Sequence, residues 1–352
     1  MKKNSVSWSG TTIGVDLGDR TSRMCVLDTA GEIVEEAVIA TTRSSFERRF
    51  ARLERARVVL ETGSHAGWAN DVLEQAGHEV IVANARKVRS ISSNERKCDE
   101  LDARMLAQLG RVDARLLCPV EVRKSQQRED LMLVRARSAA VESRTALINS
   151  VRGLAKASGF RLKARSSSSF HKEALDPSLR AALRPLMSAI EHLTKSIARY
   201  DKQIARLCWS RYPQTRLLTQ VHGVGELTAL YFVLLIGDTA RFERPRDVGA
   251  YLGLVPRRDQ SGAKDPQLRI SKTGDRLGRV LLVQCAHYIL GPFGKDSDLR
   301  RFGEKIAARG GKAAKKRAVV ATARKLAVVL FALLRKGEVY EPLRNASKTR
   351  AA

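Results

Sequence analysis

The alternation of apolar and polar residues near the start of the chain is typical of a small β-sheet. Residues 11–17 and 22–28 alternate on either side of a short turn, and a third alternating segment follows at 32–41. Two compact apolar segments, 57–61 and 79–83, have the length of buried strands. The pattern therefore predicts a β-meander followed by two further strands.

Helical segments alternate with the later strands. They are expected at 44–55, with Ser44 or Ser45 as cap, at 66–76, ending at Gly77, and at 99–109, ending at Gly110. Strands followed by alternating helices and strands predict an α/β domain with a mixed sheet.

The middle of the chain has the apolar spacing of two long amphipathic helices. The first runs from 124 to 157 and the second from 178 to 207, with a serine run at 166–169 between them. This arrangement predicts a helical hairpin, with a coiled coil as one form of it, although its heptads are imperfect. From residue 211 onward the pattern is mostly helical.

The length of 352 residues exceeds the roughly 250–300 that one hydrophobic core usually serves, so at least two domains are expected. The patterns place boundaries at 1–120, 121–210 and 211–352. With 43% apolar residues, the chain is not expected to be disordered throughout.

The net charge of +27 is distributed unevenly along the chain. Residues 1–120 carry 18 basic and 17 acidic side chains, whereas residues 121–352 carry 46 and 20. Arg outnumbers Lys by 44 to 20, and Arg binds phosphate in a bidentate manner. A nearly neutral region joined to a strongly basic one indicates a nucleic-acid partner and argues against an ordinary small-molecule enzyme.

The cysteines and apolar segments bear on the compartment. Five scattered cysteines without a CxxC spacing suggest neither a disulfide framework nor a zinc site. The first residues lack an apolar signal segment, and the longest apolar run, 227–236, is about half the ~20 residues of a membrane span. We expect a cytoplasmic protein, associated with the nucleoid when it acts, with no membrane partner.

Four carboxylates form the first candidate site. Asp16 interrupts the apolar strand IGVDLG, Glu61 ends the strand VVLE, and Asp99 and Asp102 share one face at the start of a helix. Oxygen ligands suit Mg²⁺, and two such ions stabilise attacking and leaving oxygens at a phosphodiester. The order matches ribonuclease-H-like nuclease folds. Alternatively, the acids serve only a turn and a helix dipole, or the glycine-flanked hairpin belongs to a sugar or acetate kinase, which has no need of the basic remainder.

The segment VHGVGELTALYFVLLIGD at 221–238 has the form of a helix-hairpin-helix. Gly223 and Gly225 permit a tight turn before an apolar helix, whose first amides can receive a phosphate without reading sequence. A plain turn between two helices is an equally good interpretation.

Ser261 is the candidate nucleophile. It lies in an expected loop before Gly262, and no His is nearby to form a protease-like triad. Cations beside a serine would stabilise the charge that develops on a phosphorane, and a phosphoserine bond would retain energy for rejoining. The alternative is a Ser-Gly turn whose neighbours only bind phosphate. These neighbouring cations are Arg257, Arg258, Lys264, Arg269 and Lys272.

These motifs together resemble the insertion-sequence transposases of family one hundred and ten. The matching segments span about 12 to 290, in the order of that family: GVDLGDRTSRMCVLD, VVLETGSH, KCDELDARMLA, VHGVGELTALYFVLLIGD, RF, VGAYLGLVP, QSG and ISKTGDRLGRVLL. The resemblance implies a RuvC-like DEDD domain followed by a serine-bearing transposase domain.

The resemblance also implies roles for residues and partners. The four acidic positions fall on Asp16, Glu61, Asp99 and Asp102, which would hold Mg²⁺, and the serine falls on Ser261. It implies cut-and-join recombination of target and donor DNA, guided by a structured non-coding bridge RNA that pairs with both. It implies a homo-oligomer, dimer or tetramer, in which acidic and serine sites can come from different subunits. The motif QSG departs from a common doubled serine, and Ser271 is the fallback nucleophile.

Three functions fit these residues. The first is an RNA-guided recombinase with a serine nucleophile. The second is a metal-dependent junction-resolving nuclease in which Ser261 is inert. The third is a nucleic-acid-binding remnant whose catalytic sites are dead. A covalent protein–DNA adduct separates the first function from the others, and metal-dependent nicking separates the second from the third.

Overall fold

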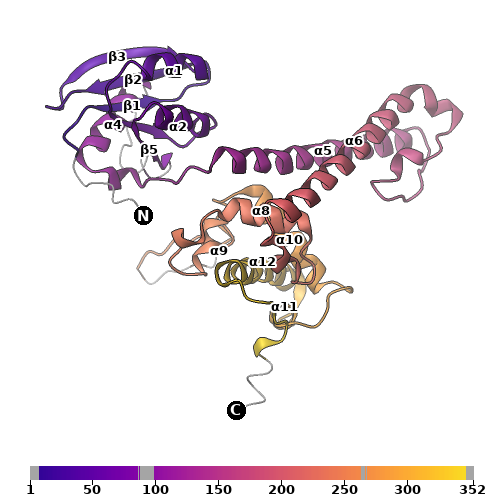
Figure 1. Ribbon diagram of the computed structural model, residues 1–352. Helices are drawn as coiled ribbons and strands as arrows, with labels where there is room; N and C mark the ends of the chain where they lie inside the picture. Colours follow the sequence, from indigo (N-terminus) through magenta and orange to yellow (C-terminus); the bar gives the residue numbers. More distant parts are fainter. Residues whose placement is uncertain (1–7, 86, 88–98, 263–265, 267, 346–352) are drawn as a thin grey trace. The chain divides into compact units, whose positions relative to one another are not determined.

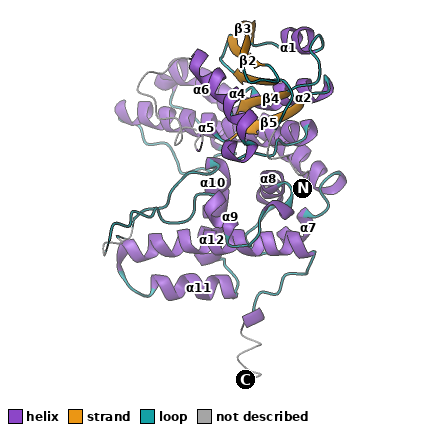
Figure 2. Cartoon of the chain, turned by 90° about the vertical axis from the view of Figure 1, so that its left-hand side faces the viewer, coloured by secondary structure: helices purple, strands orange, loops and turns teal. Residues whose placement is uncertain are grey.

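A computed structural model describes residues 8–85, 87, 99–262, 266 and 268–345 (Figure 1). The chain divides into two compact units, Met1–Arg128 and Glu129–Ala352. All strands labelled in Figure 2 belong to the first unit, which is α/β, while the second is mostly helical.

The first unit is built on a mixed five-stranded sheet with the order β3-β2-β1-β4-β5. The meander β1–β2–β3 is antiparallel, whereas β4 runs parallel to both β1 and β5. The predicted mixed sheet is confirmed. The strands are β1 Thr12–Asp16, β2 Thr21–Leu27, β3 Ile33–Ala40, β4 Arg57–Glu61 and β5 Glu79–Ala83.

Helices cover both faces of this sheet. Helices α1 (Arg43–Phe50) and α2 (Ala66–Gln75) pack on the face that includes Ile13 and Val15. Helix α4 (Asp99–Val112) packs on the opposite face, because alternation along β1 turns Gly14 toward it.

Two helix boundaries differ from the prediction. Helix α1 ends at Phe50, before residue 55, and its cap is Thr42, whose side chain accepts the Ser45 amide, so neither Ser44 nor Ser45 is the cap. It ends there because Phe46 and Phe50 already fill the core and the chain must turn into β4.

Gly110 does not terminate α4, which continues to Val112. A Cβ at Gly110 would lie 2.4 Å from Cγ2 of Val59. This glycine therefore serves a close approach between helix and sheet.

Two long helices open the second unit and match the prediction closely. They are α5 (Ser125–Ala157), whose first residues still belong to the first unit, and α6 (Pro177–Ser210). They run antiparallel: Arg137 Nε lies 2.7 Å from Asp201 Oδ1, and Arg144 Nη1 lies 3.3 Å from Thr194 Oγ1. Apolar side chains around Phe170 fill the distal end of the pair.

The rest of the second unit surrounds α8 (Glu226–Ile236), which is buried from Thr228 to Ile236. A helix that is apolar on all sides belongs in the middle of a core. The other described elements of this unit are η2 Phe170–Lys172, α7 Thr215–Thr219, η3 Thr239–Arg241, α9 Asp247–Tyr251, α10 Arg276–Leu290, α11 Asp298–Ala307 and α12 Gly311–Lys336, while η1 Ala114–Leu117 belongs to the first unit.

Candidate functional site

The sheet brings Asp16 and Glu61 to one edge. They are the last residues of the parallel neighbours β1 and β4, and the register pairs Val15 with Leu60 immediately before them. Two residues back, Gly14 and Val59 both contact α4, so alternation directs Asp16 and Glu61 to the same face. Both acids are half-buried.

Helix α4 begins at this same edge. Its residues Ala103 and Ala107 lie against Gly14, while Gly110 approaches Thr12, so the helix runs antiparallel to β1. Its first turn therefore lies toward the carboxyl end of β1. An exposed ion pair joins that turn to β2: Glu100 Oε1 lies 3.2 Å from Arg23 Nη1.

Asp102 is half-buried in this first turn, and Asp99 is the first residue of the helix. The side chain of Asp99 lies outside the part of the chain that the structure describes. Among the described side chains, no three His, Cys, Asp or Glu residues gather closely enough to hold a metal ion. The shared metal site stays a prediction, which the common edge and the oxygen-only donors fit.

Two residues at this edge were not predicted from the sequence. Arg23 lies directly opposite Asp16 in the β1–β2 register and so shares its face. His65 precedes α2, and its Nδ1 accepts a hydrogen bond of 3.2 Å from Trp68 Nε1, which leaves Nε2 3.9 Å from Asp19 Oδ1. The position of His65 four residues after Glu61 was the available signal.

Ser261 lies exposed on a loop of the second unit. An isolated antiparallel bridge between Pro256 and Ile270 closes the base of this loop. Two backbone hydrogen bonds flank the bridge, from Arg257 N to Arg269 O at 2.9 Å and from Ser271 N to Val255 O at 2.8 Å. The predicted loop position of Ser261 is confirmed.

The cations predicted around Ser261 are exposed where the structure describes them. The backbones of Arg257 and Arg269 are hydrogen-bonded at the base of the loop. The guanidinium of Arg258 donates a hydrogen bond to the side chain of Gln260. Lys272 has a φ of 55°, which is unusual for a residue with a side chain. Lys264 lies outside the described residues.

The base of the loop is held by buried and capping contacts. Asp275 caps α10 by accepting the Gly278 amide at 2.8 Å, and it also accepts the Tyr231 hydroxyl at 2.9 Å. Burial, and then the negative charge of Asp275, raises the pKa of Tyr231 to about 12. Arg279 Nη1 donates to the carbonyl oxygens of Leu252 and Gly274.

The fallback Ser271 belongs to this rigid base. It is half-buried, and its hydroxyl lies 3.1 Å from that of Thr273. Ser261 is therefore the more accessible of the two serines.

The glycine hairpin joins α7 to α8. Gly223 has a φ of 94°, and a Cβ there would lie 3.0 Å from Cδ1 of Tyr288. Gly225 caps α8, so the first amides of that helix lack acceptors within it. Glu226 follows directly and contributes a negative charge at this helix end.

No helix within the described ranges combines the length and apolar character that crossing a membrane requires.

Comparisons with known proteins match two successive parts of the chain. A transposase model for the DEDD domain of IS110 elements matches residues 13–158, and a model described as transposase IS116/IS110/IS902 family matches residues 215–298. The chain is 29% identical to the transposase for insertion sequence element IS1111A of Coxiella burnetii over 342 residues, which cover 93% of this chain and 90% of that protein.

Two further relatives extend the comparison. A probable family 20 transposase of Pseudomonas aeruginosa is 28% identical over 94% of this chain and 98% of its own length. A pilin gene-inverting protein of Moraxella lacunata is 28% identical over 156 residues, 43% of this chain and 47% of that protein.

These matches define a transposase, an enzyme that recombines DNA. The chain belongs to the IS110 family of insertion-sequence transposases, as the resemblance predicted. The matching DEDD domain indicates dependence on a divalent metal ion.

Proposed function

We propose that this transposase moves an insertion sequence by RNA-guided cut-and-join recombination, with Ser261 as its nucleophile. The observation that carries the proposal is the exposure of Ser261 on a clamped loop among exposed arginines. Guanidinium groups stabilise negative charge on phosphate oxygens, so this loop suits attack on a phosphodiester.

The proposed chemistry conserves the number of phosphoester bonds. The Ser261 oxygen forms a bond to phosphorus as one DNA oxygen leaves, and the serine proton passes to a base. In the second step a DNA hydroxyl attacks the phosphoserine and displaces the serine oxygen. Strands are rejoined without ATP because each broken ester is replaced by another.

The acidic edge of a RuvC-like first domain is the second part of the proposal. Asp16, Glu61, Asp99 and Asp102 would hold Mg²⁺, which when bound supplies charge stabilisation at a phosphodiester. The placement of Asp16, Glu61 and the first turn of α4 at one sheet edge supports this assignment.

The partners in this proposal are target DNA, donor DNA and a structured guide RNA, bound by a homo-oligomer. The glycine hairpin would act as a helix-hairpin-helix, with Gly223 and Gly225 presenting backbone amides to phosphate. Arg257, Arg258, Lys264, Arg269 and Lys272 would grip the backbone around Ser261.

The helical hairpin is the proposed RNA- or DNA-binding arm. Residues 121–210 carry 18 basic and 8 acidic side chains. Exposed cations near its distal end can be changed to Gln without touching the core, namely Arg161, Lys163, Arg180 and Arg184. If this arm binds nucleic acid, the binding constant falls with salt concentration. The variant with all four substitutions should reduce the steepness of log K against log salt concentration by roughly 0.7–0.9 for each phosphate that it no longer neutralises. An unchanged slope would remove the arm from the proposal.

The test of function is a strand-exchange assay with labelled target and donor DNA and the co-purified RNA. Ser261→Ala should bind both nucleic acids and fail to cleave or exchange strands, while Ser271→Ala should remain active. Sequencing of the co-purified nucleic acid should recover one discrete structured RNA; random fragments would argue against a guide.

The second candidate function is a metal-dependent junction-resolving nuclease, which the acidic edge alone would favour. In that case Ser261→Ala would still nick DNA in the presence of a divalent metal. Loss of nicking in Asp102→Asn with full activity in Ser261→Ala would establish the nuclease and reject the serine mechanism.

A further inference from the structure

Two exposed aromatic rings and a half-buried imidazole form a row on the second unit. Phe293 is 74% exposed and stacks on Tyr288, which is 44% exposed, with centroids 6.5 Å apart and planes at 27°. The ring of His222 lies 5.3 Å from that of Tyr288 at 57°. We call His222, Tyr288 and Phe293 the ring row. A single exposed apolar residue is common on protein surfaces, whereas exposed rings that contact one another mark a candidate binding site.

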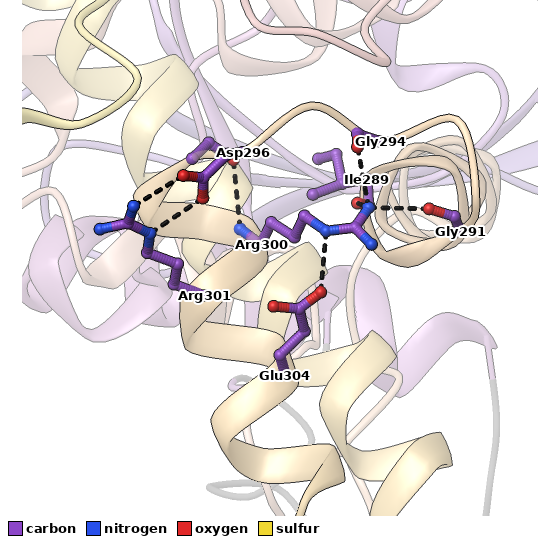
Figure 3. Close-up of polar contacts among 8 residues, drawn as sticks. Ile289, Gly291, Gly294, Asp296, Arg300, Arg301 and Glu304 are labelled. Carbon is purple, nitrogen blue, oxygen red and sulfur yellow. Dashed lines mark hydrogen bonds and ion pairs between the residues drawn. The ribbon is translucent and has the colours of Figure 1, made fainter.

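The turn that carries Phe293 is fixed by one guanidinium. Arg300 Nη1 donates to the carbonyl oxygens of Ile289 at 3.0 Å, Gly291 at 2.7 Å and Gly294 at 2.9 Å (Figure 3). Arg300 Nε lies 2.8 Å from Glu304 Oε1, which orients the guanidinium.

Two further contacts make the turn rigid. A Cβ at Gly294 would lie 1.9 Å from the Ile289 carbonyl oxygen, so the backbone is tightly folded. His222 Nε2 donates to the carbonyl oxygen of Phe293 at 3.1 Å. The Phe293 backbone is thus held from two sides, and binding on its ring would order little that is not already ordered.

The surroundings of the ring row suit a polyanion that carries flat bases. Residues 211–352 contain 28 basic and 12 acidic side chains, and Lys295 is exposed two residues after Phe293. The neighbouring Asp296 is held in an ion pair with Arg301 at 2.6 Å (Figure 3). His222 and Lys295 also line a pocket of about 240 Å³.

The row also adjoins the glycine hairpin. His222 and Gly223 belong to that hairpin, and a Cβ at Gly223 would lie 3.0 Å from Cδ1 of Tyr288. A backbone that passes the amides of the hairpin would therefore bring its bases within reach of these rings.

We propose that His222, Tyr288 and Phe293 form a stacking site for an unpaired nucleobase. An aromatic face stacks on any base, whereas bases inside an intact duplex have no free face to offer. The proposal rests on the proposed function only in taking nucleic acid as the partner, and it requires no catalytic role for Ser261. A second copy of this chain is the competing occupant of the exposed ring.

The test is equilibrium binding of the full chain to three probes: oligothymidylate, oligouridylate and a fully paired duplex. Phe293→Ala should weaken binding of an unpaired strand about 5- to 150-fold, the range for loss of one stacked base. Phe293→Trp should restore it. Duplex binding should change by less than about twofold, since charge dominates it.

The control variant is Trp209→Ala, which removes another exposed aromatic side chain of the same unit. The Trp209 ring is already covered by Arg216, whose Cζ lies 4.1 Å from the ring centroid. It should leave binding of unpaired strands unchanged. A larger loss for oligothymidylate than for oligouridylate would identify DNA as the source of the base, and the reverse would identify RNA.

Three outcomes would overturn the stacking site. They are equal losses for duplex and unpaired strands, no loss for Phe293→Ala, or a lower sedimenting mass of that variant without nucleic acid, which would assign the ring to a contact between copies. Normal binding by the parent protein with an inactive exchange reaction would count against the proposed function and leave the stacking site intact.

Discussion

The candidate site of the first unit is made of carboxylates and that of the second unit is surrounded by arginines, and the two lie in different kinds of structure. In the first unit, whose residues 1–120 are almost neutral, carboxylates lie at strand ends and a helix start, where buried backbone fixes them. In the second unit, arginines and Ser261 lie on an exposed loop with a clamped base. A site for a cation needs fixed ligands, whereas a site for DNA backbone needs accessible positive charge, so the two arrangements suit the two sites that we propose.

The largest effect is expected at the acidic edge of the first unit, which the comparison requires to be chemically active. Asp16→Asn and Asp102→Asn should each lower strand exchange by about 10³-fold or more, because a bound metal contributes several kcal/mol of charge stabilisation. Nucleic-acid binding should persist. Glu100→Gln is the matched control, since Glu100 lies in the same turn but pairs with Arg23; it should retain most activity. Equal losses in all three variants would contradict an assignment to particular carboxylates.

The fixed backbone of the acidic edge can be tested at Gly14. An added Cβ would lie 2.0 Å from the Ala103 carbonyl oxygen and 2.5 Å from the Ala107 amide nitrogen, both backbone atoms. Gly14→Ala should therefore destabilise the first unit by about 3 kcal/mol or more. Gly63→Ala, where nothing lies within 4 Å, should change little. Urea denaturation measures both; equal midpoints would show that α4 does not fix this edge.

A buried carboxylate, Asp130, is expected to stabilise the helical second unit. Both oxygens of Asp130 lie 2.8 Å from Arg211 Nη1, and one accepts the Tyr212 hydroxyl at 2.8 Å. Asp130→Ala would leave that buried hydroxyl without a partner, at a cost of about 2–3 kcal/mol. Glu191→Ala, which removes an exposed ion pair with Lys195, should leave the denaturation midpoint unchanged. A similar shift of the denaturation midpoint in both variants would show that the buried contacts of Asp130 stabilise the unit no more than an exposed ion pair does.

The smallest expected effect is a pH dependence at the base of the serine loop. The pKa of Tyr231 is raised to about 12, against roughly 10 when unfolded, so its contribution to stability is complete below pH 10 and is lost as pH rises through about 12. Tyr231→Phe should cost about 1 kcal/mol below pH 10, and this difference should shrink between pH 10 and 12. A constant difference over that range would contradict the raised pKa of Tyr231.

Much of the fold follows from the sequence because strand and helix periods are local. The strand segments of the first unit and the two long helices lie close to where the pattern predicts them. Helix ends were less predictable where a glycine has two uses: Gly110 reads as a helix stop but serves close packing against Val59. The end of α1 likewise depends on Phe50 filling a core that local patterns do not reveal.

Some residues of the candidate sites can likewise be predicted from the sequence and others cannot. Asp16, Glu61 and Ser261 are visible because each breaks a local pattern or lies in a recognisable loop. The ring row is not visible, because His222 and Tyr288 are far apart in sequence and meet only when the hairpin packs on α10. The clamp by Arg300 has no signal either, since its acceptors are backbone carbonyls.

Residue-level mapping of a covalent protein–DNA adduct tests the serine mechanism most directly. The transposase would be incubated with target DNA, donor DNA, any RNA that co-purifies with it and Mg²⁺. The reaction would be quenched with denaturant, digested with nuclease and protease, and analysed by mass spectrometry. We expect a nucleotide attached through phosphate to Ser261, absent from Ser261→Ala and present in Ser271→Ala. A nucleotide on another residue, or strand exchange by Ser261→Ala without any adduct, would contradict the serine mechanism.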